Sequence, residues 1–223
     1  NAYGLIYGAP EMSTDHSPIL DPMKSTTSFL DVPAQDPKTP RASGPPLKSS
    51  VFWGDEAIWT SKSDVHNSMF DGQGRLWMTA RIRPPQTPAY CRAGSTHPSA
   101  KRFPMNEAVR QAAMYDPKTK KLTYIDLCFH AHHLMFAEDA NNTLWFSGGG
   151  RNSGPVGWLN TKKFLETGDA AASQGWTAIV VDTNGNGVRD EYTEPGKPMD
   201  PTKDMRIGPG IYAVSTSPVD GTV

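Results

Sequence analysis

LDPMKSTTSFLDV at residues 20–32 decides the fold, because YDPKTKKLTYIDL at residues 115–127 repeats its pattern. The register between the two copies has no gaps. Asp21, Pro22 and Asp31 of the first copy correspond to Asp116, Pro117 and Asp126 of the second, at a constant offset of 95 residues. Repeat units bury their apolar faces against their neighbours, so this repetition governs the interpretation of the whole chain.

The turn chemistry of the repeat indicates two hairpins in series. Asp-Pro followed by Met-Lys or Lys-Thr favours a tight turn between strands rich in β-branched and aromatic residues. A His-led apolar run then follows each copy, HNSMFDGQGRLWMTA at residues 66–80 and HHLMFAEDANNTLWFSG at residues 132–148. Within these runs DGQG or DANN forms the turn, and Leu-Trp begins the return strand. Two hairpins give four antiparallel strands, which is one blade of a β-propeller, although the repeat need not begin where the blade does.

Composition agrees with an all-β fold. The 223 residues include 20 Gly and 20 Pro, and only 37% are hydrophobic, which suits many short strands and long loops. We count about three four-stranded blades, whereas propellers usually close with about four to eight. A third repeat starts at GIYAVSTSPVDGTV, residues 210–223, where the sequence ends, and the first residue is Asn1 rather than Met. We therefore expect residues 1–223 to form a partial β-propeller, a fragment whose remaining blades belong to the same protein or to a second chain.

Charge and cysteine content limit the partners and the compartment. Lys plus Arg number 22 and Asp plus Glu number 23, so no polybasic field indicates nucleic acid, and no apolar run of about 18 residues indicates a membrane span. Cys91 lies in a long loop and Cys128 ends a predicted strand. We expect them to form a disulfide in a secreted or periplasmic protein; two unpaired thiols are the alternative.

Three insertions depart from a minimal blade. Residues 33–59 are rich in Pro, Lys and Ser, and residues 84–108 contain Cys91. In residues 161–175 the sequence TKKFLETGD begins with a Thr N-cap candidate and predicts the one short helix of the chain. Long loops on a rigid scaffold commonly carry ligand contacts, but these insertions could instead cover sheet edges or neighbouring subunits.

DTNGNGVRDEYTE at residues 182–194 has the spacing of a calcium loop. Oxygen-bearing side chains occupy positions 1, 3 and 5, and a glycine at position 6 allows the sharp turn. The candidate ligands are Asp182, Asn184, Asn186, the carbonyl of Val188, Asp190, Glu191 and Glu194. An EF-hand has Glu at position 12, where this chain has Thr193, so the motif is closer to dockerin and thrombospondin-type loops. We predict a structural Ca²⁺ ion; a metal-free Asx-rich turn is the alternative.

The histidines are the candidates for catalysis. His66 heads the first apolar run, and His130, His132 and His133 precede the second. The innermost strand of each propeller blade lines a central channel, so equivalent histidines would face one axis. Aligning HNSMF with HHLMF pairs His66 with His132, whereas counting back from Leu-Trp pairs it with Leu134. Strand alternation places His130 and His132 on one face and His133 on the other. These side chains could bind a metal, transfer protons, or simply form hydrogen bonds between blades.

These repeats resemble those of virginiamycin B lyase-like propellers. The shared features are the Asp-Pro-x-Thr hairpin, the His-led strand, and Asp-x-x-Gly/Asn-x-Leu-Trp with a Phe/Met-Thr/Ser ending. RQAAMYDPKT at residues 110–119 and GPVGWLNTKK at residues 154–163 stand where that family has its Ile-Gly-Arg-Ile/Leu-Asp/Asn-Pro strand. The resemblance covers the strands and not the insertions.

The resemblance implies a seven-bladed propeller that opens a cyclic depsipeptide by elimination, using Mg²⁺ and a histidine base. Channel-facing histidines carry over to His66 and to His132 or His133. Glu138, after the second apolar run, is a candidate metal-binding acid. The long insertions and the calcium-like loop depart from that compact family and argue against the same antibiotic substrate.

Two functions of different classes follow from these patterns. In the first, the protein is a metal-assisted lyase or hydrolase with His66, His132 and His133 as catalytic residues and Mg²⁺ or another divalent ion in the channel. In the second, it is a non-catalytic propeller whose loops bind a glycan, a peptide or a protein partner, with Ca²⁺ stabilising one loop. Convergence of the three histidines would favour the first function.

Overall fold

The computed structural model describes residues 4–52, 54–149 and 154–223, so Trp53, inside the predicted insertion 33–59, lies outside them. The chain forms two compact units whose segments alternate along the sequence. Unit 1 contains Asn1–Gln86 and Val109–Asp126, and unit 2 contains Thr87–Ala108 and Leu127–Val223. The segment between the two halves of unit 1 therefore belongs to unit 2.

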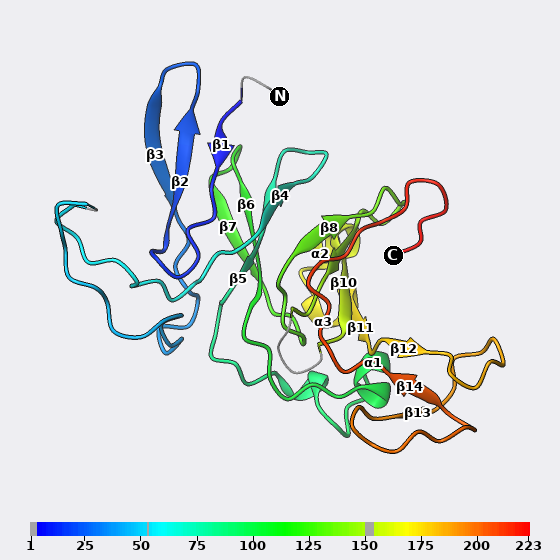
Figure 1. The fold of residues 1–223 in the computed structure, drawn as a ribbon. Helices are drawn as coiled ribbons and strands as arrows, with labels where there is room; N and C mark the ends of the chain where they lie inside the picture. The colour runs from blue at the N-terminus through cyan, green and yellow to red at the C-terminus, as the bar shows by residue number, and fades with distance from the viewer. Residues whose placement is uncertain (1–3, 53, 150–153) are drawn as a thin grey trace. The chain divides into compact units, whose positions relative to one another are not determined.

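Unit 1 contains two antiparallel sheets (Figure 1). The first has the order β1-β2-β3, with β1 at Ile6–Tyr7, β2 at His16–Asp21 and β3 at Thr26–Asp31. The second has the order β4-β5-β6-β7, with β4 at Ser68–Phe70, β5 at Leu76–Ala80, β6 at Gln111–Asp116 and β7 at Lys121–Ile125. The four-stranded sheet thus combines the His-led hairpin with the Asp-Pro hairpin that follows it.

The two Asp-Pro hairpins have the same register. Asp21 pairs with Thr26 in the first hairpin, and Asp116 pairs with Lys121 in the second. The carboxylate of Asp21 accepts the N–H of Met23, and Asp116 likewise accepts an N–H two residues later. Ser25 and Lys120, which are also 95 residues apart, both have a positive φ, 52° and 58°. The sequence repeat is therefore a repeat of backbone conformation.

The core of unit 1 joins its two sheets. Leu76, Met78 and Ala80 alternate along β5 and are buried together with Val32, Val65 and Ala113. Partly buried side chains from both sheets pack against this cluster: Tyr7, Leu30, Tyr115, Leu122 and Tyr124. Because Trp77 and Thr79, on the other face of β5, are also fully buried, this strand is covered on both sides.

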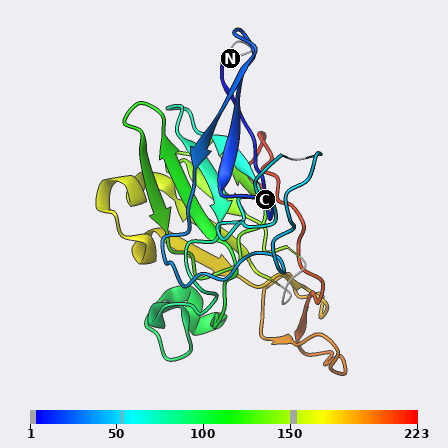
Figure 2. The same ribbon diagram turned by 90° about the vertical axis from the view of Figure 1, so that its left-hand side faces the viewer.

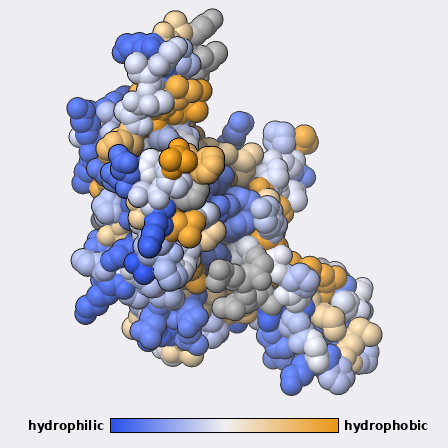
Figure 3. Space-filling model, turned by 60° about the vertical axis from the view of Figure 1, so that its left-hand side comes forward, coloured by the Kyte–Doolittle hydropathy of each residue, from blue (hydrophilic) through white to orange (hydrophobic). Residues whose placement is uncertain are grey.

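The opposite face of the β1–β3 sheet is exposed. Ile6 pairs with Leu20 and Pro18 with Phe29, so these side chains share one face of the sheet. Ile6 is 55% exposed, Leu20 40% and Phe29 61%. Figure 3 shows hydrophobic atoms, in orange, at the surface in the upper part of the view. Unit 1 by itself leaves this apolar face uncovered.

Unit 2 also contains a four-stranded antiparallel sheet, of order β11-β10-β9-β8. Its strands are β8 at Leu134–Phe136, β9 at Thr143–Phe146, β10 at Val156–Asn160 and β11 at Gln174–Thr177. A smaller mixed sheet has the order β12-β14-β13, with β12 at Val180–Val181, β13 at Tyr192–Thr193 and β14 at Asp204–Arg206. The orange ribbon in Figures 1 and 2 marks this small sheet and its loops.

Unit 2 also holds the helices of the described residues, all of them short. They are the 3-10 helix η1 at Ala89–Cys91, α1 at Pro98–Arg102, α2 at Thr161–Thr167 and α3 at Ala170–Ser173. The predicted helix is α2, but its N-cap is Asn160, whose side chain accepts the N–H of Lys163, and not Thr161. The prediction of one helix was wrong, because the sequence showed no periodic pattern for helices of four and five residues.

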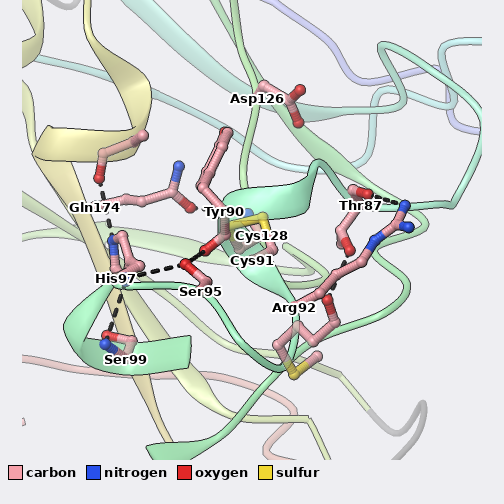
Figure 4. The surroundings of a disulfide bond; sticks show 12 residues. Thr87, Tyr90, Cys91, Arg92, Ser95, His97, Ser99, Asp126, Cys128 and Gln174 are labelled. Atoms are coloured by element: carbon pink, nitrogen blue, oxygen red, sulfur yellow. Dashed lines mark hydrogen bonds between the residues drawn. A yellow bond between two sulfur atoms is a disulfide. The ribbon is translucent and has the colours of Figure 1, made fainter. Parts of the chain in front are cut away.

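A disulfide between Cys91 and Cys128 attaches the inserted segment Thr87–Ala108 to the rest of unit 2 (Figure 4). The Cys128 N–H donates to Gln174 Oε1 at 2.8 Å. The hydroxyl of Ser99, on α1, accepts the N–H of Trp176 on β11 at 3.0 Å. The indole of Trp176 in turn donates to the Phe103 carbonyl at 2.6 Å. The insertion is thus held by one covalent bond and by backbone-directed hydrogen bonds.

The architecture is all-β, but it differs from three four-stranded blades. The described residues hold two four-stranded antiparallel sheets and one three-stranded antiparallel sheet beside the small mixed one, and none of these sheets closes on itself. Residues 210–223 were predicted to begin a third repeat, and they form no strand. Its turn does form, since the Ser217 N–H donates to the Thr222 carbonyl at 2.7 Å, but no partner strand extends the ladder. No helix in the described ranges combines the length and the apolar character needed to cross a bilayer.

Candidate functional site

The strand register determines which histidines are equivalent. In unit 1 Phe70 pairs with Leu76, and in unit 2 Phe136 pairs with Leu144. Five residues, 71–75, connect the first pair, and seven, 137–143, connect the second. The second turn is therefore two residues longer, which is the difference that the pairing of His66 with His132 requires.

Backbone hydrogen bonds at the other end of each hairpin support the same pairing. The His66 N–H donates to the Thr79 carbonyl at 3.2 Å, and the His132 N–H donates to the Ser147 carbonyl at 2.8 Å. One residue later, the N–H of His133 donates to the Ser147 hydroxyl, just as the N–H of Asn67 donates to the Thr79 hydroxyl. His66 is therefore the counterpart of His132, and Leu134 is not.

His66 lies at a network of charged side chains inside unit 1. Its Nδ1 forms an ion pair with Glu11. Arg110 contacts both Glu11, at 3.4 Å, and the carboxylate of Asp64, at 2.8 Å. Arg81 also donates to Asp64, at 3.1 Å, and the Asp64 side chain is only 3% exposed. A carboxylate that holds a histidine nitrogen is the arrangement that orients a general base.

The backbone is strained at two residues of this network. Glu11 has a φ of 48° and Asp64 a φ of 49°, a region that L-residues seldom adopt. The two segments are joined by a hydrogen bond from the Glu11 N–H to the Val65 carbonyl at 2.8 Å. Strain of this kind is retained where surrounding contacts hold it, and it is concentrated at functional sites. No sequence pattern pointed to Glu11, which occurs in an irregular segment.

In unit 2, His132 and His133 share one acceptor. Their Nδ1 atoms lie 3.2 Å and 2.9 Å from the carbonyl oxygen of Tyr212, which also accepts the Ser147 hydroxyl at 2.7 Å. The two imidazole rings are 4.1 Å apart, and the Tyr212 ring meets both edge-on. A carbonyl can only accept, so a neutral ring that donates to it through Nδ1 has Nε2 as its basic nitrogen.

The alternation predicted for these histidines was wrong. His132 and His133 were expected on opposite faces of a strand, yet their rings are in contact, because β8 begins only at Leu134. Pleated alternation does not apply to the irregular residues that precede a strand. His130 is 8% exposed, and its ring stacks at 6.5 Å from that of His132.

Glu138, the candidate metal-binding acid, lies away from the His132 and His133 pair. Glu138 is exposed in the turn after β8, five residues beyond His133, which corresponds to about 15 Å of extended chain. His97 caps α1 by accepting the Ser99 N–H, and its ring stacks on Trp176 at 4.7 Å. Glu138 is therefore not grouped with His132 and His133, and His97 has a structural role.

The 182–194 loop, within unit 2, folds around the side chain of Asp182. Its two carboxylate oxygens accept the N–H groups of Gly185 and Gly187 at 2.7 and 2.8 Å. Asn184 accepts the N–H of Asn186 at 3.0 Å, and Asn186 accepts the N–H of Val188 at 2.8 Å. Each of positions 1, 3 and 5 thus turns the backbone with its own side-chain oxygen.

The acidic residues later in the loop have different partners. Hydrogen bonds from the amides of Asn186 and Asn184 lower the pKa of Asp190, so its carboxylate is ionised at neutral pH. Glu191 forms an ion pair with Lys203 at 3.0 Å, and Glu194 accepts Arg206 Nε at 2.8 Å. The predicted ligands Glu191 and Glu194 are therefore engaged by cationic side chains.

Comparisons of this chain with protein-family models, with curated proteins and with solved structures gave no match.

Proposed function

We propose that this chain is part of a β-propeller of the virginiamycin B lyase-like type that acts as a metal-assisted lyase or hydrolase. The observation that carries the proposal is the register, which makes His66 and His132 equivalent residues of two repeats. The exposed apolar face formed by Ile6, Leu20 and Phe29 gives a remaining blade, or a second chain, a surface on which to pack.

The local partners suggest a role for each catalytic residue. His66, held by Glu11, acts as the general base that removes a proton from the substrate. His132 and His133, whose Nδ1 atoms contact the Tyr212 carbonyl, would hold Mg²⁺ or another divalent ion through Nε2. An ion held there would supply the positive charge that an elimination or hydrolysis needs against its developing negative charge.

A paired metal and activity measurement tests this proposal. The protein and the variants His66→Asn and His132→Ala/His133→Ala are loaded with Mg²⁺, Mn²⁺ or Zn²⁺, and bound metal is measured after desalting. Turnover is measured with a panel of cyclic depsipeptides and ester substrates. We expect the double variant to lose metal and activity and His66→Asn to lose activity alone.

His16→Asn is the matched control, since this histidine is exposed and pairs with Asp31 outside the network around His66. It should retain both metal and turnover. Metal content and activity that are the same in all variants would refute the catalytic proposal.

A second candidate function is the binding of a glycan by a protein without catalytic activity. Its support is a cavity of about 320 Å³ in unit 2, lined by Trp158, Trp176, Arg102, Arg189 and neighbouring residues. An aromatic ring beside two guanidinium groups suits a sugar that carries a carboxylate or a sulfate. Isothermal titration with acidic oligosaccharides tests it: binding that is lost in Trp158→Ala supports this function, and absence of heat with the unmodified protein rejects it.

We further propose that the 182–194 loop binds one structural Ca²⁺ ion. This proposal is supported by the oxygen-bearing side chains of Asp182, Asn184 and Asn186 at alternate positions of the loop. Gly185 and Gly187, both with positive φ, allow the loop to turn around Asp182. Calcium measured in the purified protein, and a melting temperature that rises when Ca²⁺ is added, would agree with this proposal. A protein without calcium whose melting temperature does not respond to the ion would contradict it.

A further inference from the structure

Asp204 is a buried acid that the sequence pattern did not identify. It is the first residue of β14 and is 1% exposed. Its Oδ2 accepts the N–H of Asp190 at 2.8 Å, which places the carboxylate against the 182–194 loop. Its Oδ1 is buried and has no hydrogen-bond partner among the described residues. A buried carboxylate oxygen without a partner is unfavourable, so it calls for a cation or a proton.

Sheet pairing explains how a residue far along the chain reaches the loop. β13 and β14 are parallel neighbours, and Tyr192 pairs directly with Asp204. The Asp204 N–H also donates to the Glu191 carbonyl at 3.0 Å. The carboxylate of Asp204 is thereby fixed beside the end of the loop, next to the residue that occupies position 11 of the motif.

The loop alone lacks the acidic ligand that completes an EF-hand. Position 12, which normally supplies a bidentate carboxylate, is Thr193. The two glutamates nearest to it are held by Lys203 and Arg206. Ca²⁺ needs about six to eight oxygen ligands, so a carboxylate must come from elsewhere in the fold.

We propose that Asp204 Oδ1 is the completing ligand of a Ca²⁺ site formed with Asp182, Asn184, Asn186, the Val188 carbonyl and Asp190. This inference rests on the proposed binding of Ca²⁺ by the loop. Asp182, Asp190 and Asp204 supply three carboxylates for a dication, and Glu191 and Glu194 are not ligands. The ion links the loop to β14, so its binding stabilises the pairing of β14 with β12 and β13.

Calcium titration calorimetry of the whole chain at pH 7.5 tests the assignment. The variants are Asp182→Asn, Asp204→Asn and, as the matched control, Glu194→Gln. Asparagine retains an oxygen that can accept the Asp190 N–H, so Asp204→Asn removes the charge with little change in shape. We expect the affinity to fall at least about tenfold in Asp182→Asn and in Asp204→Asn, because the number of charged ligands sets Ca²⁺ affinity. It should change less than about twofold in Glu194→Gln.

The outcomes separate the inference from the proposal beneath it. If the unmodified protein does not bind Ca²⁺, both the proposed calcium site of the loop and the role of Asp204 in it are rejected. Normal binding that Asp204→Asn leaves unchanged, or that Glu194→Gln weakens instead, overturns the role of Asp204 alone. If Asp204→Asn fails to fold, carbon-13 NMR of the unmodified protein decides the matter. The carboxyl resonance of Asp204 should shift on addition of Ca²⁺, and an unchanged resonance rejects the assignment.

Discussion

Removal of the Cys91–Cys128 disulfide should destabilise unit 2 by a predictable amount. The two cysteines are 37 residues apart and both are fully buried. Closing a loop of this length restricts the unfolded chain by an entropy that corresponds to about 4 kcal/mol at 25 °C. The double variant Cys91→Ala/Cys128→Ala removes this restriction without leaving a thiol. We therefore expect a loss of about 4 kcal/mol in the free energy of unfolding.

Urea unfolding at neutral pH measures this loss, and hydrogen exchange locates it. Protection of the amides in α1 should fall most, because the disulfide ties the segment that contains α1 to Cys128, whose N–H is bonded to Gln174 of β11. Reduction of the unmodified protein should give the same loss, whereas a reductant should have no effect on the double variant. Equal stability of the oxidised, reduced and substituted proteins would refute the reasoning.

Three further predictions concern the repeats and the core. Burial opposes ionisation of Asp71, but hydrogen bonds from Trp77, Arg75 and Gln73 outweigh it and lower its pKa. The ionised Asp71 carboxylate therefore stabilises the folded state fully above about pH 4, and this stabilisation is lost as the pH falls through the lower folded-state pKa. Asp71→Asn should cost about 1–3 kcal/mol at pH 7, a difference that shrinks in acid unfolding curves and would be constant with pH if the reasoning were wrong. Gly157→Ala should lose about 1–3 kcal/mol in urea unfolding, because the new methyl group meets the buried ring of Phe129, while Gly72→Ala, which meets no atom, serves as the control. Ser25 and Lys120 occupy equivalent positions of positive φ, so Ser25→Gly and Lys120→Gly should each raise the free energy of unfolding by up to about 1 kcal/mol and raise the melting temperature. Melting temperatures that change in opposite directions would argue against the equivalence of the two positions.

The hairpins could be predicted from sequence because their determinants are local. An Asp-Pro turn and the residues beside it set the register of β2 with β3 and of β6 with β7, whatever else the chain does. The strands predicted for the third repeat do not form, because their pairing depends on distant residues. Residues 210–223 contain the turn residues, but a strand also needs a neighbour with which to pair, and nothing in the local sequence reports that neighbour.

The site residues that the sequence missed are those fixed by distant contacts. Glu11 reaches His66 from 55 positions away in the chain, and the Tyr212 carbonyl reaches His132 from 80 positions away. Asp204 depends on parallel pairing between short strands, for which two or three residues give no usable pattern. Spacing within a motif identified the 182–194 loop, but it could not show that Lys203 and Arg206 hold the glutamates.

The alternation of segments between the two units has a consequence for biosynthesis. Unit 1 has all its strands once residue 126 has left the ribosome, whereas Thr87–Ala108 then still lacks Cys128, Gln174 and Trp176. Domains tend to fold in the order of synthesis, so this segment must remain unpaired while the strands on either side of it assemble. A nascent chain should therefore expose Cys91 as a reactive thiol during that interval. Cys128 follows residue 126 by only two positions, so the Cys91–Cys128 disulfide can form early and hold this segment until Gln174 and Trp176 are synthesised.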